Sequence, residues 1–291
     1  MLLSQQLEEM DLPHAEAGVV HTLLEKGSAL RGASTRQIAA AAYTTPATLV
    51  RLGQRLGFEG WTDFFEAFLQ ERDYLDRHFQ KIDANRPFEA GDSRTVIANK
   101  IATLHQESIQ DTMALLDYGE LDRAVGLLLA ARNIYLVGVS VSLDCTLLFK
   151  RKMQRLGKTV LMESNQGELL FLLLSAAQQD CAIVVSYSGT TKRTVEAMTI
   201  LHQNGVPTIL LTGLGQNAMR PMADCVLHMT TRERLSSKIG NFTTEVSAQL
   251  LLDILYACYF AADYDKNWDK RLQMTRQAEL YRHSDNQIMK E

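Results

Sequence analysis

The spacing of apolar and polar positions changes along the chain. Residues 1 to about 77 form helix-like stretches with short breaks, and apolar and polar residues do not alternate there. From about residue 133 to 230, short β-rich apolar runs are interleaved with helical stretches. This pattern predicts an all-α unit followed by an α/β unit, whose mostly parallel sheet is flanked by helices in three layers.

The second unit can be divided into individual elements. Helices are expected at 95–116 and 121–132, ahead of the first strand, and a long apolar helix at 243–262 closes the unit. Residues after 268 are polar and charged, which predicts either a frayed end or a surface helix. The apolar runs that predict the strands are 134–137, 159–162, 182–185, 208–211 and 226–229.

A length of 291 residues suits two domains rather than one. Between the two patterns, the segment 81–94 has weak periodicity and several breakers, including Pro87 and Gly91, so we interpret it as a linker. The predicted organisation is an all-α domain at 1–80, this linker, an α/β domain at 95–265 and a polar tail at 266–291.

Composition narrows the classes of protein that remain. No charged-then-apolar leader and no charge-free apolar run of about 18 residues is present, so we expect a cytoplasmic protein with no membrane partner. The four cysteines are far apart and the seven histidines are scattered, so we expect reduced thiols and no metal site. The net charge of −4 gives no bulk attraction to nucleic acid, so any DNA contact must be local.

Two short helices in succession are predicted in the first unit. Ser34 and Gln37 form an S-x-x-Q capping box ahead of an alanine-rich run. Thr45 and Pro46 then supply a hydroxyl cap and a proline at the first helical position, and Gly57 follows the helix end. The pair has the form of a helix-turn-helix, although any short helical hairpin would give a similar pattern.

The second of these helices is amphipathic. Leu49, Leu52 and Leu56 form the apolar stripe that would pack against the first helix. The opposite face would present polar side chains to base edges and phosphates in a major groove of double-stranded operator DNA. The residues predicted to contact DNA are Thr45, Thr48, Arg51, Gln54 and Arg55.

Hydroxyl-rich turns follow two of the predicted strands. Backbone N–H groups and hydroxyls at a strand-to-helix turn suit a phosphate dianion, and a glycine lets the backbone turn closely around it. Both turns would lie beyond the carboxyl ends of strands, where ligands bind in open α/β sheets. The turns are Gly138-Val-Ser-Val-Ser142 and Ser186-Tyr-Ser-Gly-Thr-Thr191.

The segment from Thr45 to Trp61 resembles the recognition helix and following turn of the RpiR family of regulators, with Ala47, Thr48, Val50, Arg51, Leu56, Gly57, Phe58 and Gly60 identical to the family pattern. Two departures are Tyr43, where a turn glycine is usual, and Gly53 inside the helix. The serine turns resemble those of the SIS (sugar isomerase) domain over about residues 95–265, and RpiR regulators join these two modules in this order.

The resemblance implies which residues would bind an effector. The phosphate would be held by Ser140, Ser186, Ser188 and Thr191, with Gly189 at the turn and Ser142 a weaker member. Tyr187 stands where relatives more often have His or Gln, so the sugar end of the pocket would differ from theirs. Tyr187 and Glu245 are the predicted sugar contacts.

Two functions are compatible with these features. The first is a regulator that senses a phosphorylated sugar and alters operator binding, as a homodimer or homotetramer through the SIS domain, with no cofactor and no catalytic residue. It would control genes of carbohydrate or amino-sugar metabolism. The alternative is a sugar-phosphate isomerase, whose base could only be Glu245, Glu163 or Glu168, none of which lies in a recognisable motif.

Overall fold

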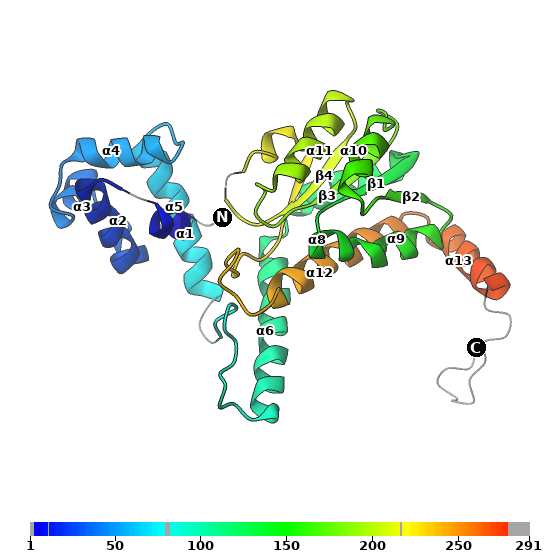
Figure 1. Ribbon diagram of the computed structural model, residues 1–291, viewed down its shortest axis with the longest axis horizontal. Helices are drawn as coiled ribbons and strands as arrows, with labels where there is room; N and C mark the ends of the chain where they lie inside the picture. The colour runs from blue at the N-terminus through cyan, green and yellow to red at the C-terminus, as the bar shows by residue number, and fades with distance from the viewer. Residues whose placement is uncertain (1–2, 11, 79–81, 216, 279–291) are drawn as a thin grey trace. The chain divides into compact units, whose positions relative to one another are not determined.

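The computed structural model describes residues 3–10, 12–78, 82–215 and 217–278 (Figure 1). Within it the chain divides into two compact units, Met1–Pro87 and Phe88–Glu291, and the division falls inside the segment 81–94. Residues 80 and 81, where the DNA-binding domain and linker were predicted to meet, lie outside the described residues, as does the end of the predicted tail at 279–291.

The first unit is all-helical. Its core joins buried side chains from all five α-helices described in the unit, among them Leu23, Ile38, Leu49 and Phe64. Burial of this set stabilises a unit too small to form several cores. Its elements are α1 (Leu3–Glu9), α2 (His14–Lys26), the 3-10 turn η1 (Gly27–Leu30), α3 (Thr35–Ala41), α4 (Pro46–Arg55) and α5 (Trp61–His78).

The second unit contains a five-stranded sheet in which all strands are parallel. Each predicted strand is confirmed to within one residue. The order β2-β1-β3-β4-β5 reverses direction at β1, so the topological switch point lies between β1 and β3. The strands are β1 (Asn133–Val137), β2 (Thr159–Met162), β3 (Cys181–Val185), β4 (Thr208–Thr212) and β5 (Cys225–His228).

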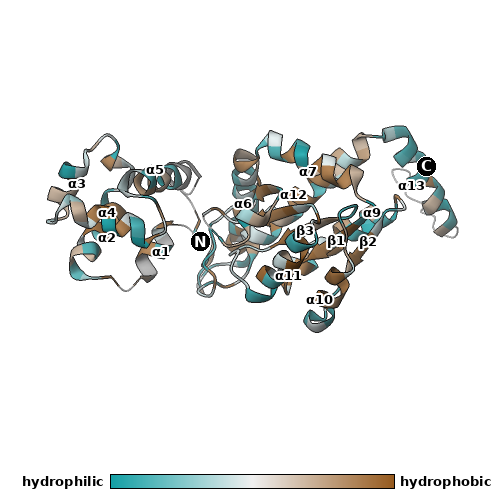
Figure 2. Cartoon of the chain, turned by 90° about the horizontal axis from the view of Figure 1, so that it is seen from above, coloured by the Kyte–Doolittle hydropathy of each residue, from teal (hydrophilic) through white to brown (hydrophobic). Residues whose placement is uncertain are grey.

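Helices cover both faces of this sheet. One core cluster joins the sheet to α7, α9 and α12, and another joins its opposite face to α10 and α11. The strands are predominantly hydrophobic, as their brown colour in Figure 2 shows. The helices and the turn η2 are α6 (Arg94–Leu115), α7 (Tyr118–Ala130), α8 (Val141–Asp144), α9 (Thr146–Gln154), α10 (Gln166–Leu174), α11 (Lys192–Gln203), η2 (Arg220–Met222), α12 (Phe242–Ala261) and α13 (Tyr264–Ala278).

The last two helices complete the unit differently. α12 buries Leu251, Leu252 and Leu255 against the sheet, whereas α13 has no buried residue and is the surface helix predicted for the tail. Among the described residues, no single helix is long and apolar enough to cross a bilayer. The pair α12 and α13 meets that criterion together, by length and composition only, and is bent by 106°.

Candidate functional site

Helices α3 and α4 are built as the capping signals predict. The Ser34 hydroxyl accepts from the Gln37 N–H at 3.3 Å, and the Gln37 side chain accepts from the Ser34 N–H at 2.8 Å. The prediction that the Thr45 hydroxyl caps α4 is wrong. Thr45 occupies the N-cap without a side-chain cap bond, because the Thr48 N–H donates to the Thr45 backbone oxygen instead, at 2.9 Å.

Gly53 has a structural explanation that its sequence context does not provide. A Cβ at this position would lie 2.6 Å from the backbone oxygen of Gly60 and 3.2 Å from the backbone nitrogen of Trp61. The segment entering α5 therefore passes directly against the α4 backbone. Glycine is required here by close approach rather than by its conformational freedom.

The exposed face of α4 differs from the predicted one at Thr48. Thr48 is only 3% exposed, so the expectation that it lies on the polar outer face is wrong. Its hydroxyl lies 3.2 Å from the Thr45 hydroxyl and accepts from Arg51 at 3.3 Å. At 100° per residue, the exposed residues Ala47, Arg51 and Gln54 share one side of the helix, with Thr48 on its flank.

Arg55 lies on the same flank and is already paired. Its Nε is 2.8 Å from a carboxylate oxygen of Glu16 on α2, and the Glu16 side chain is only 5% exposed. A guanidinium held by a buried carboxylate is oriented by the protein and keeps less of its charge for an external phosphate. Of the five residues predicted to contact DNA, Thr45, Arg51 and Gln54 are exposed and Arg55 is exposed but paired.

The two serine turns of the second unit follow neighbouring strands. β1 and β3 pair in parallel, so the turns 138–142 and 186–191 leave the same edge of the sheet on either side of the switch point. Ser140 is exposed and has a φ of 54°, a conformation that is uncommon for a residue with a Cβ. Backbone strain of this kind concentrates at ligand-binding turns.

The second turn is organised by its own polar groups. The Ser188 hydroxyl accepts from the Thr190 N–H at 3.2 Å and lies 3.1 Å from the Thr190 hydroxyl. Gly189 has a φ of 66°, and a Cβ there would overlap the Asn217 side chain. Thr191 forms the N-cap of α11 without a side-chain cap bond, which leaves its hydroxyl available, and Ser186 is 4% exposed.

A pocket lies beside these turns and contains about 350 Å³ of space, part of it open to solvent. Of the predicted effector-binding residues, it brings together Ser142, Tyr187 and Glu245. Ser140, Ser186, Ser188, Gly189 and Thr191 belong to the same sheet edge but are not among its lining residues. Sequence reasoning missed Lys238 and Asn241, which line the pocket from the segment between β5 and α12.

Two ionisable side chains of opposite sign, Lys238 and Glu245, line the pocket. Burial raises the pKa of the Glu245 carboxyl, and the nearby Glu233 carboxylate raises it further. The Lys238 ammonium is 3.0 Å from a Glu233 oxygen and 5.5 Å from the centre of the Tyr187 ring. The pocket lining therefore includes one cation, held by a carboxylate and an aromatic ring, and one carboxyl group.

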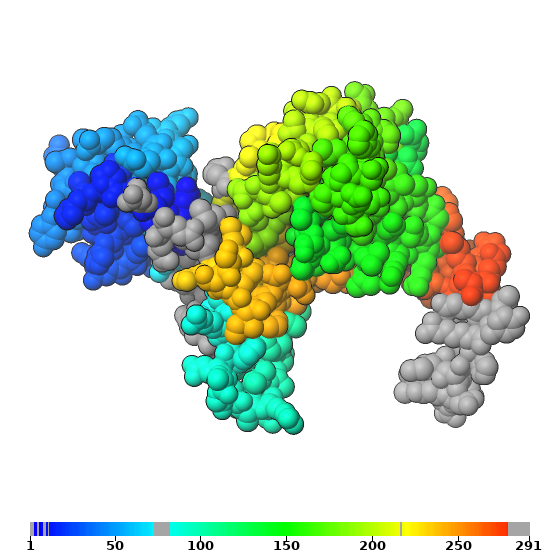
Figure 3. Space-filling view, viewed as in Figure 1, coloured from blue at the N-terminus to red at the C-terminus, as the bar shows by residue number. Residues whose placement is uncertain are grey.

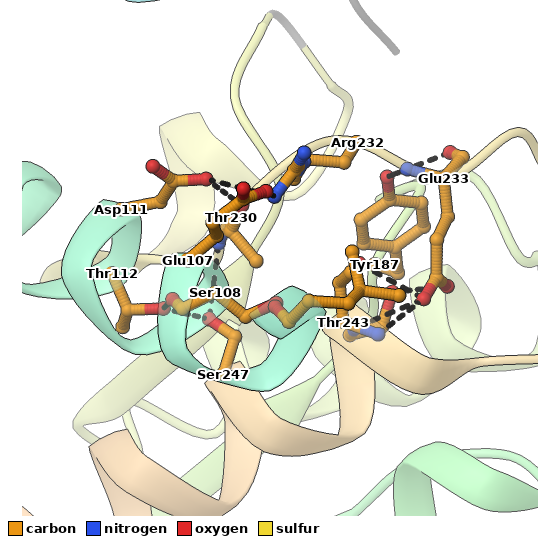
Figure 4. A network of polar contacts seen from close by, with 12 residues as sticks. Glu107, Ser108, Asp111, Thr112, Tyr187, Thr230, Arg232, Glu233, Thr243 and Ser247 are labelled. Carbon is orange, nitrogen blue, oxygen red and sulfur yellow. Dashed lines mark hydrogen bonds and ion pairs between the residues drawn. The ribbon is translucent and has the colours of Figure 1, made fainter. Parts of the chain in front are cut away.

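Glu233 anchors the segment between β5 and α12, which carries Lys238. The exposed part of this segment is visible in gold in Figure 3. The Tyr187 hydroxyl donates to the Glu233 backbone oxygen at 2.7 Å and accepts from the Glu233 N–H at 3.0 Å. The fully buried Glu233 carboxylate accepts from the N–H and the hydroxyl of both Thr243 and Thr244, at the start of α12 (Figure 4). The second serine turn, 186–191, is thus connected to α12 through Glu233.

The preceding residues fasten the same segment to α6. The Arg232 guanidinium, only 2% exposed, is 2.7 Å from Glu107 and 3.8 Å from Asp111, both on α6 (Figure 4). The Thr230 hydroxyl donates to Asp111 at 3.3 Å. We call residues 230–241 the strap, because buried polar contacts join it to α6, to α12 and to the second serine turn.

Metal ligation and thiol chemistry have little support. Across the described ranges, no group of three or more His, Cys, Asp or Glu side chains is arranged to hold a metal ion. Burial raises the pKa of the Cys145 thiol to about 11 and that of the Cys225 thiol to about 12. Thiols with such pKa values are protonated at neutral pH and are poor nucleophiles.

Comparison with known proteins covers both units. Residues 1–72 match the helix-turn-helix domain of the rpiR family, and residues 127–257 match the SIS domain. The chain is 25% identical over 254 residues to the HTH-type transcriptional regulator YbbH of Bacillus subtilis (strain 168), covering 87% of this chain and 88% of that protein. It is 28% identical over 254 residues to an HTH-type transcriptional regulator of Haemophilus influenzae, with the same two coverages.

Solved structures show the same fold. The Vibrio vulnificus NanR protein, in complex with ManNAc-6P, superposes with a TM-score of 0.63 at 22% identity, covering 97% of this chain and 100% of NanR. The sugar isomerase domain of an RpiR transcription factor from Sphaerobacter thermophilus gives a TM-score of 0.55 at 21% identity, covering 63% of this chain and 98% of that domain.

A helix-turn-helix domain followed by a SIS domain defines a class of two-domain transcriptional regulators, distinct from the isomerases that share the SIS fold. The relatives that match over both domains are named as regulators, not enzymes. Within that class, the chain belongs to the RpiR family.

Proposed function

We propose that this regulator binds a phosphorylated sugar at the switch point of its SIS domain and that this binding alters the affinity of α4 for operator DNA. The genes it controls would serve carbohydrate or amino-sugar metabolism. A homodimer or homotetramer would present two copies of α4 to two half-sites, as helix-turn-helix proteins generally do. The effector would bind the serine turns and the pocket beside them.

One observation carries the effector half of the proposal: two hydroxyl-rich turns leave neighbouring parallel strands on the two sides of the switch point. Ligands of open α/β sheets bind there, and a helix N-terminus with free N–H groups favours a phosphate. The fold neighbour NanR is complexed with ManNAc-6P, a phosphorylated amino sugar. This likeness supports the same class of ligand here.

The DNA half rests on the exposed side of α4. Arg51 and Gln54 are both exposed there, and no acidic residue occurs between Pro46 and Phe58. These are side-chain types that pair with guanine and adenine edges and with phosphates. An otherwise acidic chain thus has a local cationic surface where the duplex would lie.

The effector is tested by thermal unfolding of the full chain with a panel of sugar phosphates, the matching free sugars and inorganic phosphate. A ligand at 100 times its dissociation constant stabilises the bound unit by about 2.7 kcal/mol. Ser188→Ala should abolish that shift. Ser175→Ala serves as the control, because Ser175 is exposed at the end of α10, at the opposite edge of the sheet. Absence of a shift with every phosphorylated sugar would refute the effector half.

DNA binding is tested by gel shift with the duplex upstream of the protein's own gene, with and without the effector. Arg51→Ala should weaken binding and reduce the slope of log affinity against log salt by about one unit. Arg94→Ala is the matched control, because Arg94 is exposed at the start of α6 in the other unit. A wild-type chain that shifts no duplex at low salt contradicts the proposal.

A further inference from the structure

The turn between α3 and α4 places a tyrosine in a left-handed backbone conformation. Tyr43 has a φ of 51°. Its N–H donates to the Ala40 oxygen at 3.1 Å, and the Thr44 N–H donates to the Ala39 oxygen at 2.9 Å. These two bonds form a Schellman motif, in which the left-handed residue is usually glycine.

The same unit contains the same motif with its usual residue. At the end of α4, the Gly57 N–H donates to the Gln54 oxygen at 3.0 Å and the Phe58 N–H donates to the Gly53 oxygen at 3.1 Å. Gly57 has a φ of 87°. Two equivalent helix ends therefore differ only in whether the left-handed residue carries a side chain, and at Tyr43 that side chain adds strain.

Packing does not explain the tyrosine. Tyr43 is 98% exposed, the largest exposed fraction among the exposed hydrophobic side chains of the described chain. A ring that contacts almost nothing cannot compensate for backbone strain through burial. Strained residues that persist without a packing role occur at functional sites, so the side chain is expected to act on something outside the folded unit.

The position of Tyr43 indicates what that partner is. Tyr43 lies two residues before Thr45, the N-cap of α4, so its Cα is within about 7 Å of the helix start along the chain. Residues 34–58 contain three arginines and no acidic residue. Arg55 is paired with Glu16, whereas Arg36 and Arg51 are exposed. The exposed ring therefore lies next to the start of the proposed recognition helix, in a stretch with two exposed arginines, and its hydroxyl is a hydrogen-bond donor.

We propose that the Tyr43 hydroxyl donates a hydrogen bond to a backbone phosphate of the bound duplex, beside the groove that receives α4. Tyrosine is one of the side chains that make such contacts, which fix the position of a protein on DNA and carry no sequence information. This inference rests on the proposed DNA binding of α4. It adds a positioning contact from the turn, outside the five residues predicted from sequence.

The test uses the full chain with Tyr43→Phe and Tyr43→Gly, in duplex binding by fluorescence anisotropy and in thermal unfolding. Tyr43→Phe keeps the backbone and ring and should weaken binding by about tenfold, equally on the operator and on an unrelated duplex. Tyr43→Gly should weaken binding at least as much while raising the unfolding midpoint of the first unit by about 5 °C, because the strain is relieved.

Tyr118→Phe is the control, because Tyr118 is 66% exposed at the start of α7 and should change neither measurement. If the wild type binds duplex and Tyr43→Phe binds equally well, the phosphate contact is overturned and the proposed function stands. If Tyr43→Phe weakens binding to the operator alone, the contact is to a base and the phosphate assignment is wrong. A wild type that binds no duplex overturns both the contact and the proposed function.

Discussion

Replacing Gly53 by alanine should destabilise the first unit, although alanine is the better helix former. Inside a helix, glycine is about 0.5–1 kcal/mol less favourable than alanine, so propensity alone predicts a gain in stability. At this position the new Cβ would lie 2.6 Å from the Gly60 oxygen and 2.9 Å from the Gly60 carbonyl carbon. Both atoms belong to the backbone and cannot rotate away.

The expected change in the free energy of unfolding is the cost of the close contact less the gain in helix propensity. Overpacking a well-packed site costs about 1–3 kcal/mol, and a contact with backbone on both sides belongs near the upper end of that range. After subtracting the propensity gain, Gly53→Ala should lower the free energy of unfolding by about 2 kcal/mol. For a unit of this size, the unfolding midpoint should fall by roughly 8–16 °C.

Calorimetry of the full chain provides the assay, because two compact units are expected to unfold in separate transitions. Gly126→Ala is the matched control: Gly126 is also inside a helix, in α7, and a Cβ there would meet nothing within 4 Å. It should raise the stability of the second unit by about 0.5–1 kcal/mol. A Gly53→Ala chain as stable as the wild type, or more stable, would refute the reasoning from close approach.

Three further substitutions test the polar contacts. Tyr187→Phe leaves the buried Glu233 N–H and oxygen without their partner, and should lower the free energy of unfolding of the SIS domain by about 2–4 kcal/mol, measured by denaturant titration. Glu245→Gln should stabilise the domain near pH 7. Because the pKa of Glu245 is raised in the folded state, its ionised carboxylate destabilises the fold above that pKa and has no effect below the pKa of the unfolded chain. The gain in stability from glutamine should therefore disappear by about pH 4 in a pH series of melts. Glu16→Gln removes the carboxylate that holds Arg55 and should tighten duplex binding by about fivefold at low salt in anisotropy titrations; unchanged or weaker binding would mean that the pair orients Arg55 for DNA.

The sheet could be predicted from sequence because its signals are local. Each strand is a short apolar run bounded by breakers, and a parallel sheet buries such runs on both faces. The location of the serine turns followed from the strands, since a turn at the carboxyl end of a strand lies at the same edge of a parallel sheet as the turns after its neighbours. The positions of Ser140 and Ser188 were therefore predictable without knowledge of packing.

The exposed side of α4 could not be predicted to the same accuracy. Periodicity fixes the centre of the apolar stripe at Leu49 and Leu52, but not which flank a third helix covers. Glu16 on α2 pairs with Arg55, from which it is separated by 39 residues in sequence. The strap was missed for the same reason, because Tyr187 and Glu233 are separated by 46 residues and no local pattern joins them.

The strap connects the second serine turn to α6 through contacts made by two adjacent residues, Glu233 and Arg232. The Tyr187 hydroxyl hydrogen-bonds both the N–H and the backbone oxygen of Glu233, and the adjacent Arg232 is paired with two carboxylates of α6. A displacement of the second turn that keeps the hydrogen bonds between Tyr187 and Glu233 would therefore act on Arg232 and its buried ion pairs with α6, which are costly to break on one side. If an effector moved this turn, the displacement would be transmitted to α6 through the consecutive residues Arg232 and Glu233.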